Sequence, residues 1–260
     1  MKKTFVCLIC LFTILPLIFA VFSSEGLFKE SSNEDSSLSE TEKPQNVDFS
    51  SLTYAAFGDS ITFGADWSKD GAGNGSQMSD PYSKLVYESL NLSAYQNFGV
   101  GSSTFCANDY PNLSCHTDVI LAYEGDADII SVMLGSNDWG YSLPLGTITD
   151  NDTSTVYGSL NLIAKHLTTV HEDSFVFFMT PYKNSLTIET DYPLSDIVKA
   201  VKVVAANYNI PVLDMYNLGN FELEMYDENS DGVHPSQEFF KKYTAPQIVE
   251  FIRQNYKASK

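Results

Sequence analysis

The stretch Leu-Thr-Tyr-Ala-Ala-Phe-Gly-Asp-Ser-Ile-Thr, residues 52–62, decides the fold of this chain. It begins as a short apolar, β-prone run and ends at a glycine and a serine, which predicts a buried strand that delivers Ser60 to its carboxyl end. Ligands bind at that edge in open parallel α/β sheets. A serine hydroxyl there becomes a nucleophile only if a base, a group that orients the base and oxyanion donors surround it. The later chain contains candidates for each of these groups.

Apolar runs and helical spacings alternate along the rest of the chain. Strands that alternate with helices imply parallel β-α units joined by right-handed crossovers. The predicted fold class is therefore α/β, a three-layer α/β/α sandwich around about five parallel strands. The proline at 211 predicts that the last strand lies at an edge or starts there. The expected strands are 52–57, 92–97, 128–134, 174–180 and 210–214, and the expected helices are 80–90, 118–123, 153–171, 195–208 and 236–256.

The first fifty residues differ in composition from the rest. A basic start, an apolar run and small residues at its end predict a secretory signal peptide at 1–23, and an uncleaved anchor is the alternative, because the run approaches the length that spans a bilayer. Residues 24–50 are rich in serine and acidic residues, which predicts a flexible spacer. Residues 51–260 suffice for one domain. We expect a secreted or cell-surface protein that touches the membrane only through an uncleaved N-terminal segment.

The charge balance limits the kinds of partner. The chain carries a net charge of −18; since Lys2 and Lys3 contribute +2 and residues 24–50 contribute −5, the remaining part carries −15. Such a surface repels phosphates and anionic lipid headgroups, which argues against nucleic acid and against electrostatic membrane binding. A neutral small-molecule or carbohydrate ester fits better. We expect the protein to act as a monomer.

The predicted mature chain contains two cysteines, Cys106 and Cys115. A nearby pair in an exported chain predicts a disulfide, with two free thiols as the alternative. Because the enclosed loop is short, the bridge would contribute at most about 2–3 kcal/mol to stability.

Three residues have the chemistry of a nucleophile and its activating groups. Ser60 is the candidate nucleophile, and His234 is the candidate base, because imidazole titrates near neutral pH. Asp231 lies three residues before His234 and can reach the other ring nitrogen across a turn. The amide of Asn137, which follows the strand at 128–134, can stabilise an oxyanion together with backbone N–H groups.

Four short blocks in this order resemble the signature blocks of the SGNH (GDSL) hydrolases. They are Gly58-Asp59-Ser60-Ile61-Thr62, the glycine turn at 99–101, Gly135-Ser136-Asn137-Asp138 and Asp231-Gly232-Val233-His234-Pro235. The resemblance covers the chain from about residue 52 to its end. It implies a flavodoxin-like sandwich and serine ester hydrolysis through an acyl-enzyme, with no metal or organic cofactor. The family's serine, asparagine, aspartate and histidine roles fall on Ser60, Asn137, Asp231 and His234.

The second block departs from the family pattern. The family's asparagine is followed, after four residues, by the oxyanion glycine, and this spacing places Ser102 at the glycine position. Gly101 lies one position early. Either the N–H group of Ser102 points inward, or the loop shifts by one residue and Gly101 supplies the donor. We favour Gly101, together with the Ser60 N–H group and the Asn137 amide.

The substrate is defined only by class. The absence of a long apolar lid segment favours a short acyl group on a polar or carbohydrate alcohol. A lipase-like or thioester hydrolase of the same fold is the alternative, as is an inactive binding protein. Six aromatic residues would suit sugar stacking, although aromatics at loop ends pack more often than they bind: Tyr82, Tyr95, Tyr110, Trp139, Tyr141 and Tyr182.

A calcium-binding loop is a competing hypothesis for the last block. Residues 227–232, followed by Glu238, fit the EF-hand pattern, which would use the carboxylate of Asp231. This loop would place His234 where an aliphatic residue normally packs, and it would explain none of the other blocks. We therefore expect no metal site.

Overall fold

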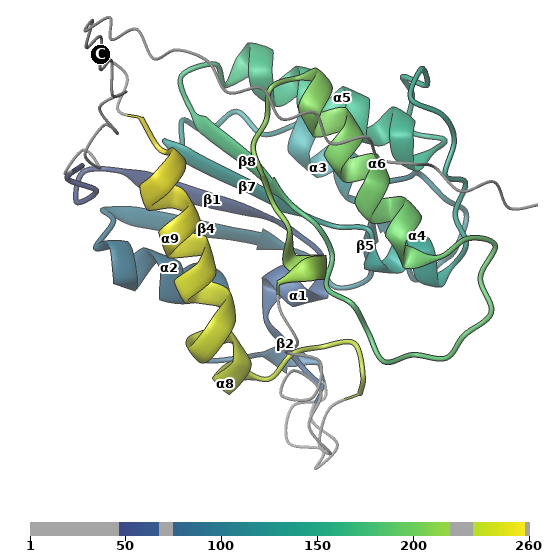
Figure 1. The fold of residues 1–260 in the computed structure, drawn as a ribbon, viewed down its shortest axis with the longest axis horizontal. Helices are drawn as coiled ribbons and strands as arrows, with labels where there is room; N and C mark the ends of the chain where they lie inside the picture. The colour runs from purple at the N-terminus through teal and green to yellow at the C-terminus, as the bar shows by residue number, and fades with distance from the viewer. Residues whose placement is uncertain (1–46, 68–74, 219–230, 258–260) are drawn as a thin grey trace, which may run out of the picture. The chain divides into compact units, whose positions relative to one another are not determined.

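The computed structural model describes residues 47–67, 75–218 and 231–257, all within one compact unit that spans Pro44–Lys260. A five-stranded parallel sheet forms its centre, in the order β4-β1-β7-β8-β9 (Figure 1). When the five strands are numbered by their order along the chain, they lie across the sheet in the order 2-1-3-4-5. This is the flavodoxin-like order, with its switch point beside β1. The predicted α/β sandwich is confirmed. The strands are β1 (Thr53–Gly58), β4 (Ala94–Gly99), β7 (Ile129–Met133), β8 (Phe175–Met179) and β9 (Val212–Leu213).

Both faces of the sheet are buried under helices. Successive side chains of a strand point to opposite faces, so Ala55 and Phe57 join one core cluster, whereas Tyr54 and Ala56 join the other. The helices therefore form two outer layers (Figure 1). The first face is covered by α3 (His116–Leu121), α5 (Val156–Val170) and α6 (Leu194–Asn207), and the second by α2 (Tyr82–Leu90) and α9 (Ala245–Asn255).

Every predicted strand and long helix is present, with small shifts at the ends. β9 lies at the edge of the sheet, as the proline at 211 predicts, and Pro211 uses only its carbonyl, which accepts a hydrogen bond from Phe178. The predicted helix 236–256 is interrupted. It consists of α8 (Gln237–Phe239), a π-helical turn (Phe240–Thr244) and α9, because the π turn accommodates an extra residue in the helix.

Short elements that the sequence analysis does not predict surround the carboxyl edge of the sheet. They are too short to show a periodic pattern of apolar residues. Two of them, α1 and α4, begin directly after β1 and β7. The set comprises α1 (Ser60–Phe63), α4 (Ser136–Gly140), the 3-10 turn η1 (Met215–Asn217), an antiparallel ribbon of β2 (Ala65–Asp66) and β3 (Ser76–Gln77), and a parallel pair of β5 (Ser103–Thr104) and β6 (Ser114–Cys115).

The predicted disulfide between Cys106 and Cys115 is wrong, since both are free thiols. The β5–β6 register pairs Cys115 with Thr104, so Cys106 lies two residues further along and its side chain packs into the core. Each sulfur instead lies near a backbone carbonyl: the Cys106 Sγ is 3.8 Å from the oxygen of Pro144, and the Cys115 Sγ is 3.3 Å from that of Phe105.

The N-terminal segments are only partly described. The predicted signal peptide and most of the segment 24–50 lie outside the described residues. Phe49, at the end of that segment, is buried, and its ring lies 5.6 Å from that of Tyr256. The folded unit therefore begins before residue 51. Within the described parts of the chain, no helix has both the length and the apolar character needed to cross a bilayer.

Candidate active site

Ser60 is the first residue of α1, at the switch point of the sheet. Asp59 caps this helix, and its Oδ1 atom accepts a hydrogen bond of 2.9 Å from the backbone N–H of Ile61. The helix packs closely on the end of β4, where a Cβ atom on Gly99 would lie 2.1 Å from the backbone nitrogen of Phe63. Glycine at this position therefore lets α1 lie against the sheet and fixes Ser60 at its carboxyl edge.

A hydrogen-bonded series joins Ser60 to two residues near the other end of the chain. The Ser60 Oγ atom lies 2.7 Å from His234 Nε2, and His234 Nδ1 lies 2.7 Å from Asp231 Oδ2. The His234 side chain is only 13% exposed. The turn holds the carboxylate in place, because Asp231 Oδ1 accepts hydrogen bonds from the backbone N–H groups of Val233 and His234, at 2.9 and 2.8 Å. Ser60, His234 and Asp231 thus have the geometry of a nucleophile, a base and its orienting carboxylate.

The Asp231 carboxylate is engaged on both oxygens. Partial burial raises its pKa, but the hydrogen bonds from the ring and backbone of His234 and from Val233 outweigh this effect, so the pKa lies below its ordinary value. The calcium hypothesis needs the same carboxylate, and its residues 227–230 lie outside the described part of the chain. The residues that the structure describes contain no cluster of His, Cys, Asp and Glu side chains able to hold a metal ion.

Asn137 lies in α4, which follows β7, the strand next to β1 in the sheet. Its Nδ2 donates a hydrogen bond of 2.8 Å to the carbonyl oxygen of Ser103, which uses one of its two N–H bonds and leaves the other for a ligand. The backbone N–H groups of Ser60, Gly101 and Ser102 have no acceptor among the described residues. These groups can therefore donate to a bound oxyanion.

The turn after β4 has its left-handed residue at Ser102, with φ of 60°. The φ of Gly101 is not positive, and a Cβ atom there would meet no other atom within 4 Å. The conformation that favours glycine thus falls on Ser102, which is the position where the family pattern has glycine.

Two buried carboxyl groups beside the site are not singled out by the sequence analysis. Asp138 is fully buried, and its two oxygens accept hydrogen bonds from the backbone N–H groups of Phe105 and Cys106, at 2.9 and 3.0 Å. Burial raises the pKa of Asp138 and of Asp59 to about 6 in each case, against the lowering effect of their backbone hydrogen bonds. Each aspartate adjoins a predicted site residue in its block, which is the only signal that the sequence offers for them.

The six aromatic residues named as suitable for sugar stacking differ in how exposed they are. Of the six considered for sugar stacking, three are buried and cannot stack on a ligand: Tyr82, Trp139 and Tyr182. Tyr95 is partly buried, and Tyr110 and Tyr141 are exposed with their rings 5.1 Å apart. Among the described residues, the aromatic ring that lies against His234 belongs to Trp67, which is not one of these six. Its side chain is 46% exposed, and its ring centroid lies 5.9 Å from that of His234.

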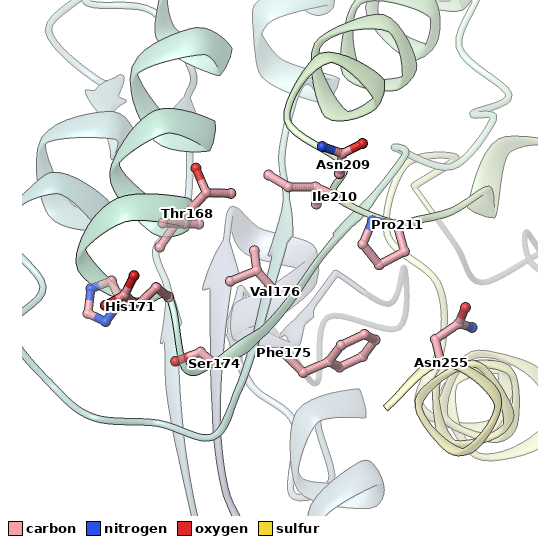
Figure 2. Close-up of a pocket in the computed structure, with 11 residues that line it drawn as sticks. Thr168, His171, Ser174, Phe175, Val176, Asn209, Ile210, Pro211 and Asn255 are labelled. Carbon is pink, nitrogen blue, oxygen red and sulfur yellow. The ribbon is translucent and has the colours of Figure 1, made fainter. Parts of the chain in front are cut away.

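A separate pocket lies at the opposite edge of the sheet (Figure 2). Phe175 and Pro211, which line it, are at the amino ends of β8 and β9. It also contains a serine and a histidine, but each bonds to a backbone carbonyl: Ser174 to Ala127 at 2.7 Å, and His171 to Tyr123 at 3.3 Å. This pocket therefore lacks the serine–histidine pair of the candidate active site.

An activatable serine at the switch point of a flavodoxin-like sheet defines the class as an α/β serine hydrolase. The chain belongs to the GDSL-like Lipase/Acylhydrolase family, whose family model matches residues 56–241, and the predicted resemblance is thereby confirmed. It is accordingly a serine hydrolase that acts on ester bonds.

Solved structures show the same fold. A protein from Lactobacillus plantarum is 23% identical, with a TM-score of 0.67, and the match covers 80% of this chain and 99% of that one. The lipase/acylhydrolase from Enterococcus faecalis is 19% identical, with a TM-score of 0.54 and coverage of 80% and 99%. An acetyl-xylooligosaccharide esterase from Geobacillus stearmophilus is 18% identical, with a TM-score of 0.53 and coverage of 82% and 99%. A comparison with curated protein sequences finds no match.

Proposed function

We propose that this protein hydrolyses esters through an acyl-enzyme on Ser60. The observation that carries the proposal is the unbroken series from Ser60 Oγ to His234 and Asp231, with both contacts at 2.7 Å. His234 Nε2 takes the hydroxyl proton as Oγ attacks the ester carbonyl carbon, and then gives it to the departing alkoxide. Water enters next, and His234 removes its proton as the water oxygen attacks the acyl carbon. The bond between that carbon and Ser60 Oγ then breaks, His234 returns the proton to Oγ, and the acid leaves.

The oxyanion of each tetrahedral intermediate lies on the Asn137 side of Ser60. The free N–H bond of the Asn137 amide, the Ser60 N–H group and one N–H group of the 101–102 turn donate to it. We assign the turn donor to the backbone N–H group of Gly101 or Ser102. The left-handed φ of Ser102 supports Ser102, whereas the sequence prediction favours the neighbouring glycine, Gly101. Asp231 acts through His234, by holding the ring in the tautomer that accepts the serine proton.

The substrate that we propose is a short acyl ester of a polar or carbohydrate alcohol. Three observations support it. The domain is strongly acidic, which favours a neutral ligand. The sequence has no long apolar lid segment, and the fold is similar to that of the acetyl-xylooligosaccharide esterase.

A lipase-like specificity is a second candidate. The exposed side chains of Leu186 and Ile188 lie in the segment that contacts the turn before His234, because the backbone N–H of Ser185 donates to the carbonyl of Gly232 at 2.9 Å. An acyl-chain series on one alcohol separates the two. The main proposal expects kcat/KM to fall from acetyl to octanoyl, and a rise along the series would favour the lipase-like specificity instead.

Covalent labelling tests the nucleophile. A fluorophosphonate should add once to the wild-type protein, at Ser60, as measured by peptide mass spectrometry. Ser60→Ala should fold, take no label and hydrolyse no ester. Ser174→Ala is the matched control, since Ser174 also lies near a histidine, and it should label and turn over normally. Normal ester turnover by Ser60→Ala would refute the assignment.

We also infer that the protein is exported, on the strength of the signal-like residues 1–23. Expression with a C-terminal tag should give a product outside the cytoplasm that lacks residues 1–23. An intact N-terminus on a membrane-bound product would favour the anchor instead.

A further inference from the structure

Trp67 is the exposed aromatic side chain whose ring contacts His234. The two ring centroids lie 5.9 Å apart with the planes tilted by 37°, and nearly half of the Trp67 side chain remains open to solvent. An indole of this size normally buries its surface. An exposed indole against the candidate base therefore offers an apolar surface at the mouth of the site.

The position of this indole is set by the ribbon β2–β3. Trp67 directly follows β2, and Gly75 directly precedes β3, so both lie at the end of the ribbon where the chain connects its two strands. The N–H of Gly75 donates to the carbonyl of Asp66 at 2.7 Å, which closes the ribbon beneath the indole. Gly75 has φ of +73°, and a Cβ atom there would lie 2.6 Å from the Cζ2 atom of Trp67. The ribbon backbone therefore packs directly on the indole, which only glycine permits.

The ribbon is in turn tied to the helix that carries the nucleophile. The N–H of Met78 donates to the carbonyl of Gly64 at 2.8 Å, and the amide of Gln77 donates to the carbonyl of Phe63 at 2.9 Å. Phe63 ends α1, and Gly64 caps it. Ser60 and Trp67 thus belong to one continuous segment that is braced at both ends, so the indole has a defined place relative to the serine.

The side on which Trp67 lies decides which half of an ester it meets. The base returns its proton to the departing alcohol, so the alcohol oxygen must lie near His234 Nε2. The carbonyl oxygen must instead point toward Asn137 and the 101–102 turn. Trp67 contacts His234, and it therefore borders the alcohol half of the substrate rather than the acyl half.

We propose that the Trp67 indole is a platform on which a sugar ring, as the alcohol half of the ester, stacks during hydrolysis. This inference rests on the proposed function. A pyranose has an apolar face of C–H bonds and carries its hydroxyl groups around the edge of the ring. A flat, half-exposed indole therefore buries the C–H face and leaves the hydroxyl groups hydrated. A neutral sugar also suits the acidic domain.

The test compares three acetate esters on four variants. The esters are an acetylated methyl xyloside, phenyl acetate and ethyl acetate, whose alcohols are a sugar, a flat aromatic ring and a group with no ring. The variants are Trp67→Ala, Trp67→Phe, Gly75→Ala and Tyr110→Ala. Tyr110 is the matched control, because its side chain is 47% exposed and its ring contacts Tyr141.

Trp67→Ala should raise KM for the xyloside about tenfold while kcat/KM for ethyl acetate changes by less than about twofold, because stacking is uniform binding of one substrate half. Trp67→Phe should recover part of the loss. Gly75→Ala should move KM in the same direction by displacing the indole. Tyr110→Ala should match the wild type on all three esters.

Three results would overturn the proposal. If Trp67→Ala lost as much kcat/KM on ethyl acetate as on the xyloside, Trp67 would be a support for His234. If it lost as much on phenyl acetate as on the xyloside, the platform would be one for aromatic alcohols, and an equal loss on the xyloside in Tyr110→Ala would remove the specific role of Trp67. Failure of the proposed function looks different. In that case wild-type protein hydrolyses none of the esters, or Ser60→Ala hydrolyses them equally well, and both proposals fall together.

Discussion

The side-chain amide of Asn137 donates a hydrogen bond of 2.8 Å to the carbonyl oxygen of Ser103. Asn137 follows β7 and Ser103 follows β4, and these two strands flank β1, which leads into Ser60. The bond therefore links the two loops on either side of the nucleophile. It orients the amide and leaves its second N–H bond free beside the 101–102 turn, where the proposed oxyanion forms.

Replacing Asn137 tests this arrangement. Asn137→Ala should lower kcat for an acetate ester by about 10²–10³, with little change in KM, because the amide donates to charge that develops only in the transition state. Steady-state kinetics and circular dichroism check the result. Asn161→Ala is the matched control, since its amide also donates to backbone carbonyls, those of Ile148 and Asp150. A similar loss in both variants would contradict the role of Asn137.

Replacing Asp231 tests the orientation of the base. Asp231→Asn should lower kcat at pH 7 by about 10²–10⁴, because the amide no longer holds the His234 ring in the required tautomer. The comparison is with Asp214→Asn: this aspartate also has a lowered pKa, despite partial burial, because it pairs with Lys202. Asp214→Asn should keep kcat near the wild-type value. If Asp231→Asn also kept it, His234 would not depend on Asp231.

Asp138 should act as a positioning residue. Its two oxygens face two N–H donors, and the amide of Asp138→Asn offers only one acceptor oxygen, so one buried N–H group would lose its partner. The free energy of unfolding should fall by about 1–3 kcal/mol. We also expect a lower kcat, because Phe105 continues the segment that holds Ser103. Ile163→Val, a core change that costs about 1 kcal/mol, should leave kcat unchanged. Equal kinetic effects in the two variants would argue against positioning.

Asp59 should make stability depend on pH in an unusual direction. Burial raises its pKa from 3.8 to about 6. The native state therefore holds this proton more tightly than the unfolded state, and the contribution of Asp59 to stability falls as the pH rises from about 4 to 6. Asparagine is as good a helix cap but carries no charge. Relative to wild type, Asp59→Asn should thus gain about 2–3 kcal/mol between pH 4 and pH 8. Urea unfolding at pH 4, 6 and 8 measures this gain, and a constant difference would contradict it.

Prediction from sequence succeeded where a segment buries a continuous face. β7 is apolar on both faces, and α5 and α6 repeat their apolar residues at helical spacing, so their existence and order could be predicted. Ser60, Asp231 and His234 could be proposed as a set, because the chemistry of a serine nucleophile requires all three and short motifs supplied them.

The remaining features depend on contacts between distant residues. Asp138 meets the backbone of Phe105, 33 residues away, and no side-chain pattern marks a backbone partner. The thiols of Cys106 and Cys115 stay apart because of the β5–β6 register, which spacing along the chain does not reveal. Trp67 precedes a glycine-rich stretch of sequence, and its contact with His234 depends on a ribbon of two-residue strands.

That ribbon has a consequence for protein engineering. Residues 65–67 and 75–77 join the rest of the unit through a few backbone and side-chain hydrogen bonds, and only Ala65 among them is buried. Ser60 lies in α1 and His234 in the turn at 231–235, so both lie outside the ribbon. A library of ribbons grafted between Gly64 and Met78 would therefore sample new alcohol preferences on an unchanged catalytic frame.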